Sequence, residues 1–174
     1  MPNTIWKEYE ANPLTHSAAH YLMAIKNLLT ERGYARVTDV ARELNITRGS
    51  CSISLKPLKQ RGLVTVDENK FLSLSEEGRR LAELVERNDE VLQSFMTDVL
   101  GIDKDQAEID ACKIEHLLSI ETSVKMAEFL KFIGRNQTVT KNFLKALREH
   151  RPECKENTAA CDLCDTHCLA TLEH

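Results

Sequence analysis

Five consecutive residues, Cys112 to His116, include three side chains that bind transition metals in proteins. On an α-helix, Cys112, Glu115 and His116 lie at positions i, i+3 and i+4 and therefore share one face. A thiolate, a carboxylate and an imidazole on one helical turn supply three ligands for a divalent ion. The spacing predicts a metal site on this helix, and a polar patch beside one packed thiol is the alternative. The apolar residues expected on the opposite face are Ala107, Ala111, Ile114 and Leu118.

The first predicted helix, from about residue 15 to residue 32, offers further candidate ligands. Its apolar stripe consists of Ala18, Leu22, Ile25 and Leu29. The opposite side should carry His16, His20, Met23 and Asn27. We expect His20 and Met23, with His16 one turn earlier, to face the acidic second half of the chain. Ordinary solvent exposure is the alternative for His16 and His20, and more so for His16. Asp89, beside the apolar stripe of a later helix, is a candidate oxygen ligand.

A third group of candidate ligands lies near the end of the sequence. It consists of Cys154, Cys161, Cys164 and Cys168, separated by six, two and three residues. A Cys-x2-Cys pair with two further thiols is typical of a zinc site or an iron–sulfur cluster, and His167 could replace one thiol. Zinc would hold the tail together, whereas a cluster would sense oxygen or iron. Free reactive thiols, or disulfides formed on handling, are the alternatives.

A helix-turn-helix precedes these groups in the sequence. Thr38 is expected to cap a short helix, Asn45 and Ile46 to form a tight turn, and Thr47 to cap a second helix that runs to about Arg61. Pro57 should kink that second helix or remove one hydrogen bond. The residues predicted to meet DNA bases or phosphates are Thr47, Arg48, Ser50, Ser54, Lys56, Lys59 and Lys70. A winged helix that binds protein is the alternative.

The elements that position these residues predict a mainly α fold. Strands over residues 63–66 and 70–74 form a hairpin directly after the helix-turn-helix, which makes a winged helix. Helices follow over about 75–100, 103–118, 120–133 and 141–150. We expect a winged-helix domain over residues 1–74, a helical metal-binding and dimerisation domain over 75–150, and a cysteine-rich tail over 151–174. The last three residues resemble the remnant of an expression tag.

Charge and composition narrow the function further. Residues 36–70 have a net charge of +3 and residues 71–121 a net charge of −8, although the whole chain has only −4. The first segment suits phosphates and the second suits cations. No apolar stretch is long enough to cross a membrane and no secretion signal is present, so we expect a cytoplasmic protein. No nucleophile–base pair or phosphate loop is found, which argues against an enzyme.

From about Leu14 to Gly134, the sequence resembles the diphtheria toxin repressor family of metal-dependent regulators, especially its shorter manganese-regulator branch without an SH3-like domain. The segments that carry the resemblance begin at Gly33, Gly62, Leu74, Gly101 and Cys112; they read GYARVTDVA, GLV, LSEEG, GID and CKIEH.

The resemblance implies a homodimer that binds iron(II) or manganese(II) and represses metal-uptake genes in its metal-bound form. By position, it assigns ligand roles to His20, Cys112, Glu115 and His116. Asp89 occupies the place of a histidine of the family, and Met23 that of a glutamate of the manganese type. Because Met23 and Cys112 replace oxygen ligands, we expect iron(II), or an ion later in the affinity series, to be preferred over manganese(II).

We therefore predict a metal-dependent repressor that binds a palindromic operator in double-stranded DNA as a homodimer. A metal-binding protein-interaction module without specific DNA binding is one alternative. A regulator that senses redox state or an iron–sulfur cluster through the C-terminal cysteines is another.

Overall fold

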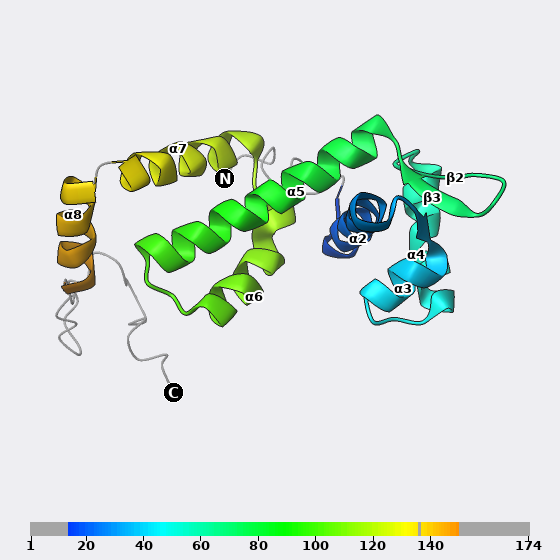
Figure 1. The fold of residues 1–174 in the computed structure, drawn as a ribbon, viewed down its shortest axis with the longest axis horizontal. Helices are drawn as coiled ribbons and strands as arrows, with labels where there is room; N and C mark the ends of the chain where they lie inside the picture. The colour runs from blue at the N-terminus through cyan, green and yellow to red at the C-terminus, as the bar shows by residue number, and fades with distance from the viewer. Residues whose placement is uncertain (1–13, 136, 150–174) are drawn as a thin grey trace, which may run out of the picture. The chain divides into compact units, whose positions relative to one another are not determined.

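The computed structural model describes residues 14–135 and 137–149, and these fall into two compact units divided after Arg135. Each unit is described by itself. The first contains a small sheet and all helices up to α7, and the second contains α8 (Figure 1). The mainly helical fold expected from the sequence is confirmed.

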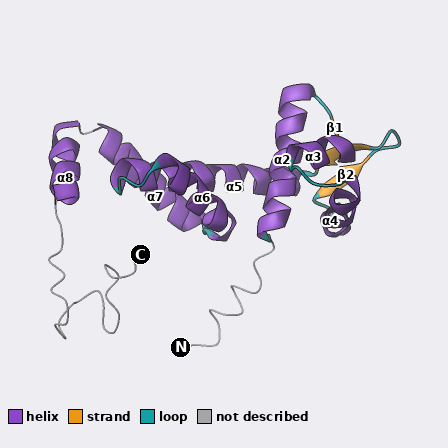
Figure 2. Ribbon diagram, turned by 90° about the horizontal axis from the view of Figure 1, so that it is seen from below, coloured by secondary structure: helices purple, strands orange, loops and turns teal. Residues whose placement is uncertain are grey.

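The first half of unit one is a winged helix. Helices α2 (His16–Arg32), α3 (Val37–Glu43) and α4 (Arg48–Gln60) pack beside an antiparallel sheet with the order β1-β3-β2. The hairpin strands β2 (Val64–Val66) and β3 (Phe71–Leu74) were expected, whereas the two-residue strand β1 (Ala35–Arg36) was not (Figure 2). Ala35 pairs with Leu72, so β1 joins α2 to the wing.

Helix caps set the boundaries of these elements. Thr47 and Ser75 cap α4 and the following helix as expected, because their hydroxyls accept the N–H groups of Ser50 and Gly78. The cap expected at Thr38 was wrong. Helix α3 begins at Val37, two residues before the start that a cap at Thr38 would give. Its N-cap is Arg36, whose backbone N–H donates to the Asp39 carboxylate at 3.2 Å.

Helix α4 continues through Pro57 to Gln60. The ring of Pro57 lies on the exposed side of the helix, as does the side chain of Ile53 one turn earlier. The hydrogen bond that proline cannot make is therefore lost on a side that water reaches, which lowers its cost.

Helix α2 is buried around more of its circumference than the single apolar stripe predicted from the sequence. Leu22 and Ile25 are buried as expected, but Ala18 and Leu29 are only partly buried. The buried set also includes Ala19, Tyr21, Ala24 and Leu28. The reason is that α2 packs against the winged-helix elements and also against the long helix α5 (Glu76–Ser94). The Lys26 ammonium pairs with the Glu86 carboxylate across the contact between α2 and α5.

Helix α5 connects the winged helix to the second half of unit one (Figure 1). It continues as a π-helical turn over Phe95–Val99 and is followed by α6 (Lys104–Ile114), a 3-10 turn over Glu115–Leu117 and α7 (Ile120–Arg135). The start of α5 fits closely under the wing, because a Cβ at Gly78 would lie 2.2 Å from the Leu63 carbonyl oxygen.

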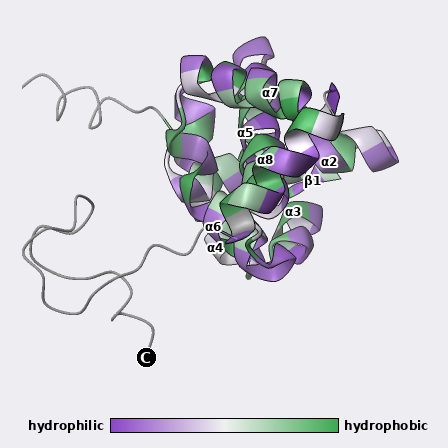
Figure 3. Cartoon of the chain, turned by 90° about the vertical axis from the view of Figure 1, so that its left-hand side faces the viewer, coloured by the Kyte–Doolittle hydropathy of each residue, from purple (hydrophilic) through white to green (hydrophobic). Residues whose placement is uncertain are grey.

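Unit two contains α8 (Gln137–Glu149), which carries Val139, Phe143 and Leu147 at four-residue intervals with their side chains exposed. Figure 3 shows hydrophobic and hydrophilic residues interspersed along α7 and α8. Across residues 14–135 and 137–149, no helix is both long and apolar enough to cross a membrane.

Candidate metal centre

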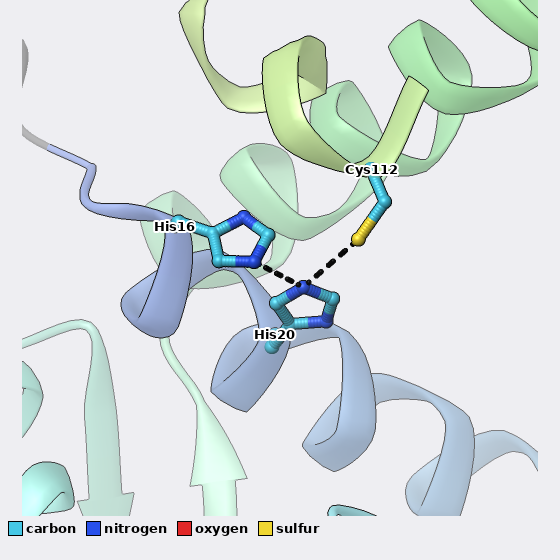
Figure 4. Close-up of side chains that lie close together, drawn as sticks. All are labelled: His16, His20 and Cys112. Carbon is cyan, nitrogen blue, oxygen red and sulfur yellow. Dashed lines mark hydrogen bonds between the residues drawn. The ribbon is translucent and has the colours of Figure 1, made fainter. Parts of the chain in front are cut away.

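Helices α2 and α6 bring three metal-binding side chains together. His20 Nε2 lies 3.3 Å from Cys112 Sγ and 3.2 Å from His16 Nε2 (Figure 4). The three candidate ligand atoms all lie within 4.8 Å of one another. His20 and Cys112 were grouped as ligands from the sequence, whereas for His16 solvent exposure was the stronger alternative. His16 is exposed, but its ring also belongs to the cluster.

The helical geometry predicted for Cys112, Glu115 and His116 was wrong in part. Helix α6 ends at Ile114, and Glu115 and His116 lie in the following 3-10 turn. Glu115 is buried like Ala107 and Ala111, eight and four residues earlier, whereas Ile114 is exposed. Glu115 therefore continues the buried side of α6 instead of the polar side.

Glu115 is a buried carboxyl group with an unsatisfied atom. Its side chain is 2% exposed, and Oε1 has no hydrogen-bond partner in the part of the chain that the structure describes. Burial and the nearby charge of Asp89 raise the pKa of Glu115 to about 7. The backbone around it is fixed, because Asn88 Nδ2 donates to the Glu115 carbonyl at 2.7 Å.

His20 and His116 are held in the form that binds metal. Burial lowers the pKa of His20 and of His116, and neighbouring imidazoles lower both further. The ring centroids of His16 and His116 are 5.3 Å apart. Because the pKa values of His20 and His116 are lowered, both rings are neutral at neutral pH and keep a lone pair for a cation.

Asp89 and Met23 differ in their surroundings. The negative charge of Asp89 acts on His20, Cys112 and Glu115, and Gln93 Nε2 donates to both of its carboxylate oxygens, at 2.9 and 2.8 Å. Met23 is half-buried and packs against the hydrophobic core of unit one. Asp89 thus contributes charge near the cluster, and the contacts of Met23 are those of a packing residue.

The donor set fits a divalent transition metal. Burial, and then the charges of Glu115, Asp89 and Glu108, raise the pKa of the Cys112 thiol. The pKa of Glu115 is raised as well, so both candidate ligands resist ionisation without a cation. A divalent ion at the cluster would reverse both shifts. The group of ligand atoms within 4.8 Å of one another includes neither Glu115 nor His116. Thiolate, imidazole and carboxylate together are typical ligands of iron(II), cobalt(II) and zinc(II). The other predicted ligands, Cys154, Cys161, Cys164 and Cys168, lie outside the described residues.

The predicted DNA-binding residues lie on α4 and the wing. Most of their side chains are exposed, and those of Ser54 and Lys59 are partly buried. The Thr47 hydroxyl caps α4 and contacts Ser50 Oγ at 2.9 Å. A groove of about 310 Å³ lies between α4 and the wing; its lining consists of Arg36, Val37, Thr38, Arg48, Asn69 and Lys70.

Sequence reasoning missed two side chains on the side predicted to face DNA. The Arg36 guanidinium stacks over Phe71 with 4.4 Å between the guanidinium carbon and the ring centroid, and this arrangement holds Arg36 at the groove. Ile53 is 66% exposed on α4, between Ser50 and Ser54. The sequence shows an isoleucine on the second helix of the helix-turn-helix, so Ile53 could have been singled out from the sequence.

A winged helix with an exposed basic helix, joined to a helical half that carries a transition-metal donor set, defines a metal-dependent regulator of transcription. Comparison with known proteins identifies the family. Residues 13–72 match the family model "Iron dependent repressor, N-terminal DNA binding domain", and residues 75–144 match "Iron dependent repressor, metal binding and dimerisation domain". The chain belongs to the iron-dependent repressor family.

Curated relatives include regulators named MntR. The chain is 28% identical over 142 residues to HTH-type transcriptional regulator MntR of Listeria monocytogenes, covering 82% of this chain and 99% of the relative. It is 25% identical over 136 residues to MntR of Lysinibacillus sphaericus, covering 78% and 97%. The match therefore extends over nearly the whole length of these relatives.

Solved structures show the same fold. IdeR of T. acidophilum matches with a TM-score of 0.55 and 25% identity, covering 65% of this chain and 53% of that one. A manganese-dependent transcriptional repressor in complex with manganese matches with a TM-score of 0.55 and 25% identity, covering 66% and 53%. The chain thus aligns with about half the length of these two structures.

Proposed function

We propose that this protein is a homodimeric repressor whose affinity for DNA is set by one divalent ion at His20, Cys112, Glu115 and His116, with Asp89 nearby. The contact between His20 and Cys112 carries the proposal, because it joins α2 of the winged helix to α6 of the metal-binding half. A bound ion would supply positive charge between two helices whose ligands otherwise resist ionisation. Family membership supports DNA binding over the alternative of a protein-interaction module.

Iron(II) is the proposed native ion and manganese(II) the second choice. Two observations favour iron: a thiol at Cys112 and imidazoles at His20 and His116. Soft and borderline ligands of this kind favour iron over manganese, which prefers carboxylate and water oxygens. Relatives are named MntR and one structural neighbour holds manganese, so manganese(II) stays in every test.

The coupling between metal and DNA follows from the positions of the ligands. His20 lies on α2, which packs against the other winged-helix elements, and Cys112 lies on α6. Stabilising the contact between α2 and α6 fixes the winged helix against the dimerisation half of each protomer. Because a dimer reads two half-sites, a fixed spacing between two recognition helices raises the affinity for a palindromic operator.

The proposed DNA surface divides into base-reading and phosphate-binding residues. Arg48, Ser50 and Ser54 on α4 read bases, and exposed Ile53 between them offers an apolar contact for a thymine methyl group. Phosphates are bound by Lys56, Lys59, Lys70 and Arg36. The groove between α4 and the wing, which Arg36, Arg48 and Lys70 line, would receive one phosphate strand.

A homodimer is supported by apolar side chains that the described units leave exposed. They include Ile109, Ile114, Leu117, Ile120, Val124 and Phe132 in unit one, and Val139, Phe143 and Leu147 in unit two. The family model matched over residues 75–144 is one of dimerisation, which supports covering these residues with a second copy.

The four C-terminal cysteines support a separate proposal, which rests on their spacing. Cys154, Cys161, Cys164 and Cys168 would hold zinc or an iron–sulfur cluster. An iron–sulfur cluster would make the repressor respond to oxygen as well as to free metal.

The experiment that tests the main proposal measures DNA binding against metal. DNA selected from a random pool by the iron-loaded protein is labelled, and its affinity is measured anaerobically with iron(II), with manganese(II) and with chelator. We expect binding to be at least tenfold tighter with metal than with chelator. Equal affinity in all three conditions would exclude a metal-dependent repressor.

A further inference from the structure

We propose that His16 is a further ligand of this ion, and that the resulting set of three imidazoles and one thiolate discriminates against manganese(II). The inference rests on the proposed metal site and extends it to a residue outside the ligand set taken from the sequence. It also predicts which ions the site prefers.

The first argument is the spacing of the donor atoms. His16 and His20 lie four residues apart on the first two turns of α2 and therefore share one face. Their Nε2 atoms are 3.2 Å apart, and Cys112 Sγ lies 3.3 Å from His20 Nε2. These separations match neighbouring ligand atoms around one ion with bonds of about 2.0–2.3 Å. Figure 4 shows the two rings and the thiol directed toward one another.

The second argument is that hydrogen bonding alone does not account for the cluster. A neutral imidazole Nε2 carries either one hydrogen or one lone pair, both in the ring plane. His20 Nε2 meets two neighbours at hydrogen-bond distance, His16 Nε2 and Cys112 Sγ, and one site cannot be well aligned with both. A cation among the three atoms would use the lone pair of each.

The third argument is that His16 would complete the ligand set on the side that solvent reaches. The ring centroids of His116 and His16 are 5.3 Å apart, so His16 lies close to the turn that carries His116 and buried Glu115. His16 is exposed, whereas His20 and Cys112 are partly buried. His16 is thus positioned to complete the donor set on its solvent side, where water would otherwise be the ligand.

The chemical consequence is selectivity. With His16, the nitrogen and sulfur donors number four, from His16, His20, His116 and Cys112, against one carboxylate from Glu115. Affinities for such donors rise from manganese(II) through iron(II) and cobalt(II) toward zinc(II), whereas manganese gains little from them. His16 should therefore strengthen binding of the later ions more than binding of manganese(II).

Cobalt(II) is the spectroscopic probe, because its absorption reports both thiolate ligation and coordination geometry. The full chain is titrated anaerobically, and the bands that Cys112→Ser removes are assigned to this site, which separates it from the C-terminal cysteines. Zinc(II) and manganese(II) affinities are measured by competition with a chromophoric chelator. The variants are His16→Ala and His16→Gln, with exposed Ser17→Ala as the matched control.

We expect both His16 variants to shift the visible cobalt bands and to weaken cobalt and zinc binding at this site by tenfold or more. Even outer-shell partners of metal ligands typically contribute 10–100-fold. Manganese affinity should change less, so the zinc-to-manganese ratio falls, and Ser17→Ala should match the wild type. Glutamine keeps a hydrogen bond to His20 but is a poor ligand, so a His16→Gln variant with wild-type bands and affinities would overturn the inference.

Failure of the inference is distinguishable from failure of the proposed function. If cobalt gives no band that depends on Cys112, the metal site itself is wrong. If that band forms and metal still controls DNA binding, but His16 substitution leaves cobalt and zinc affinities within threefold of wild type, only the role of His16 is wrong.

Discussion

His20 Nε2 and Cys112 Sγ lie 3.3 Å apart although the two residues are separated by 92 positions in the sequence. His20 belongs to a helix that forms the core of the winged helix, and Cys112 belongs to the helical half that matches the metal-binding model. This pair therefore links the part that matches the DNA-binding model to the part that matches the metal-binding model. A metal ion bound here, as we propose, would act on both.

Glu115 should make the stability of the metal-free protein depend on pH. Its pKa is raised from the ordinary value to about 7, so the folded state favours the protonated form. The contribution to stability is complete below about pH 4.5 and is lost as pH rises through about 7. At pH 8, in chelator, Glu115→Gln should be more stable than wild type by roughly 1–3 kcal/mol.

Denaturant unfolding at pH 4.5 and pH 8 measures this difference, and Glu108→Gln on the exposed side of α6 is the matched control. At the lower pH, the Glu115→Gln advantage should disappear because the wild-type carboxyl is then protonated. An advantage of equal size at both pH values would show that glutamine acts through packing instead of charge.

Metal affinity should show the opposite dependence on pH. Binding requires ionised Cys112 and Glu115, and the pKa values of both are raised. Proton competition should therefore weaken affinity as pH falls, with about two protons released per ion below pH 7 and about one above it. Chelator competition between pH 6 and pH 8.5 measures the slope, and a flat profile would contradict ligation by these groups.

Arg48→Ala and Lys59→Ala should have different effects on DNA binding. If Arg48 makes a bidentate base contact, its loss costs about 1–3 kcal/mol on the selected operator and little on random DNA. Loss of a phosphate contact at Lys59 should weaken all sequences similarly and reduce the salt slope by about one. Equal loss by Arg48→Ala on selected and random DNA would show that Arg48 does not read bases.

The protein should be a two-fold dimer with half-sites one or more helical turns apart, each turn being about 34 Å. Replacing exposed Phe143 and Leu147 on α8 with serine should raise the dimer dissociation constant, because association then removes less apolar area from water. Light scattering at micromolar concentration is the measurement. A wild-type monomer with and without metal would contradict the dimer.

The C-terminal cysteines should bind zinc or an iron–sulfur cluster. Anaerobically purified protein with a cluster would be brown, and zinc would give about one tightly held ion per chain beyond the Cys112 site. Substituting Cys161 and Cys164 together should remove that signal and leave the Cys112-dependent cobalt bands intact. Four freely titrating thiols in fresh, metal-replete protein would rule out both forms.

Local patterns in the sequence account for most of the fold. The caps at Thr47 and Ser75 and the alternation around the wing predict α4, the hairpin and α5 because each depends on residues close in the chain. Burial around α2 was underestimated because it depends on packing against two separate partners. Strand β1 is too short to give a periodic signal and exists only by pairing with β3.

The candidate site was predicted in composition but not in geometry. Of the CKIEH motif, Cys112 lies in the cluster with His16 and His20, whereas the helix ends at Ile114 and Glu115 turns to the buried side beside Ala111. An exposed His16 and a clustered His16 look the same in sequence, because only the approach of α6 distinguishes them.

The dependence of DNA binding on metal, measured in wild type and in His116→Ala, tests the central claim most directly. Fluorescence anisotropy with the selected operator is recorded anaerobically with chelator, iron(II) or manganese(II). We predict that metal tightens wild-type binding at least tenfold, and that His116→Ala keeps its fold by circular dichroism but gains nothing from metal. If the His116→Ala variant still binds the operator only when iron(II) or manganese(II) is added, the regulatory site is not where we place it.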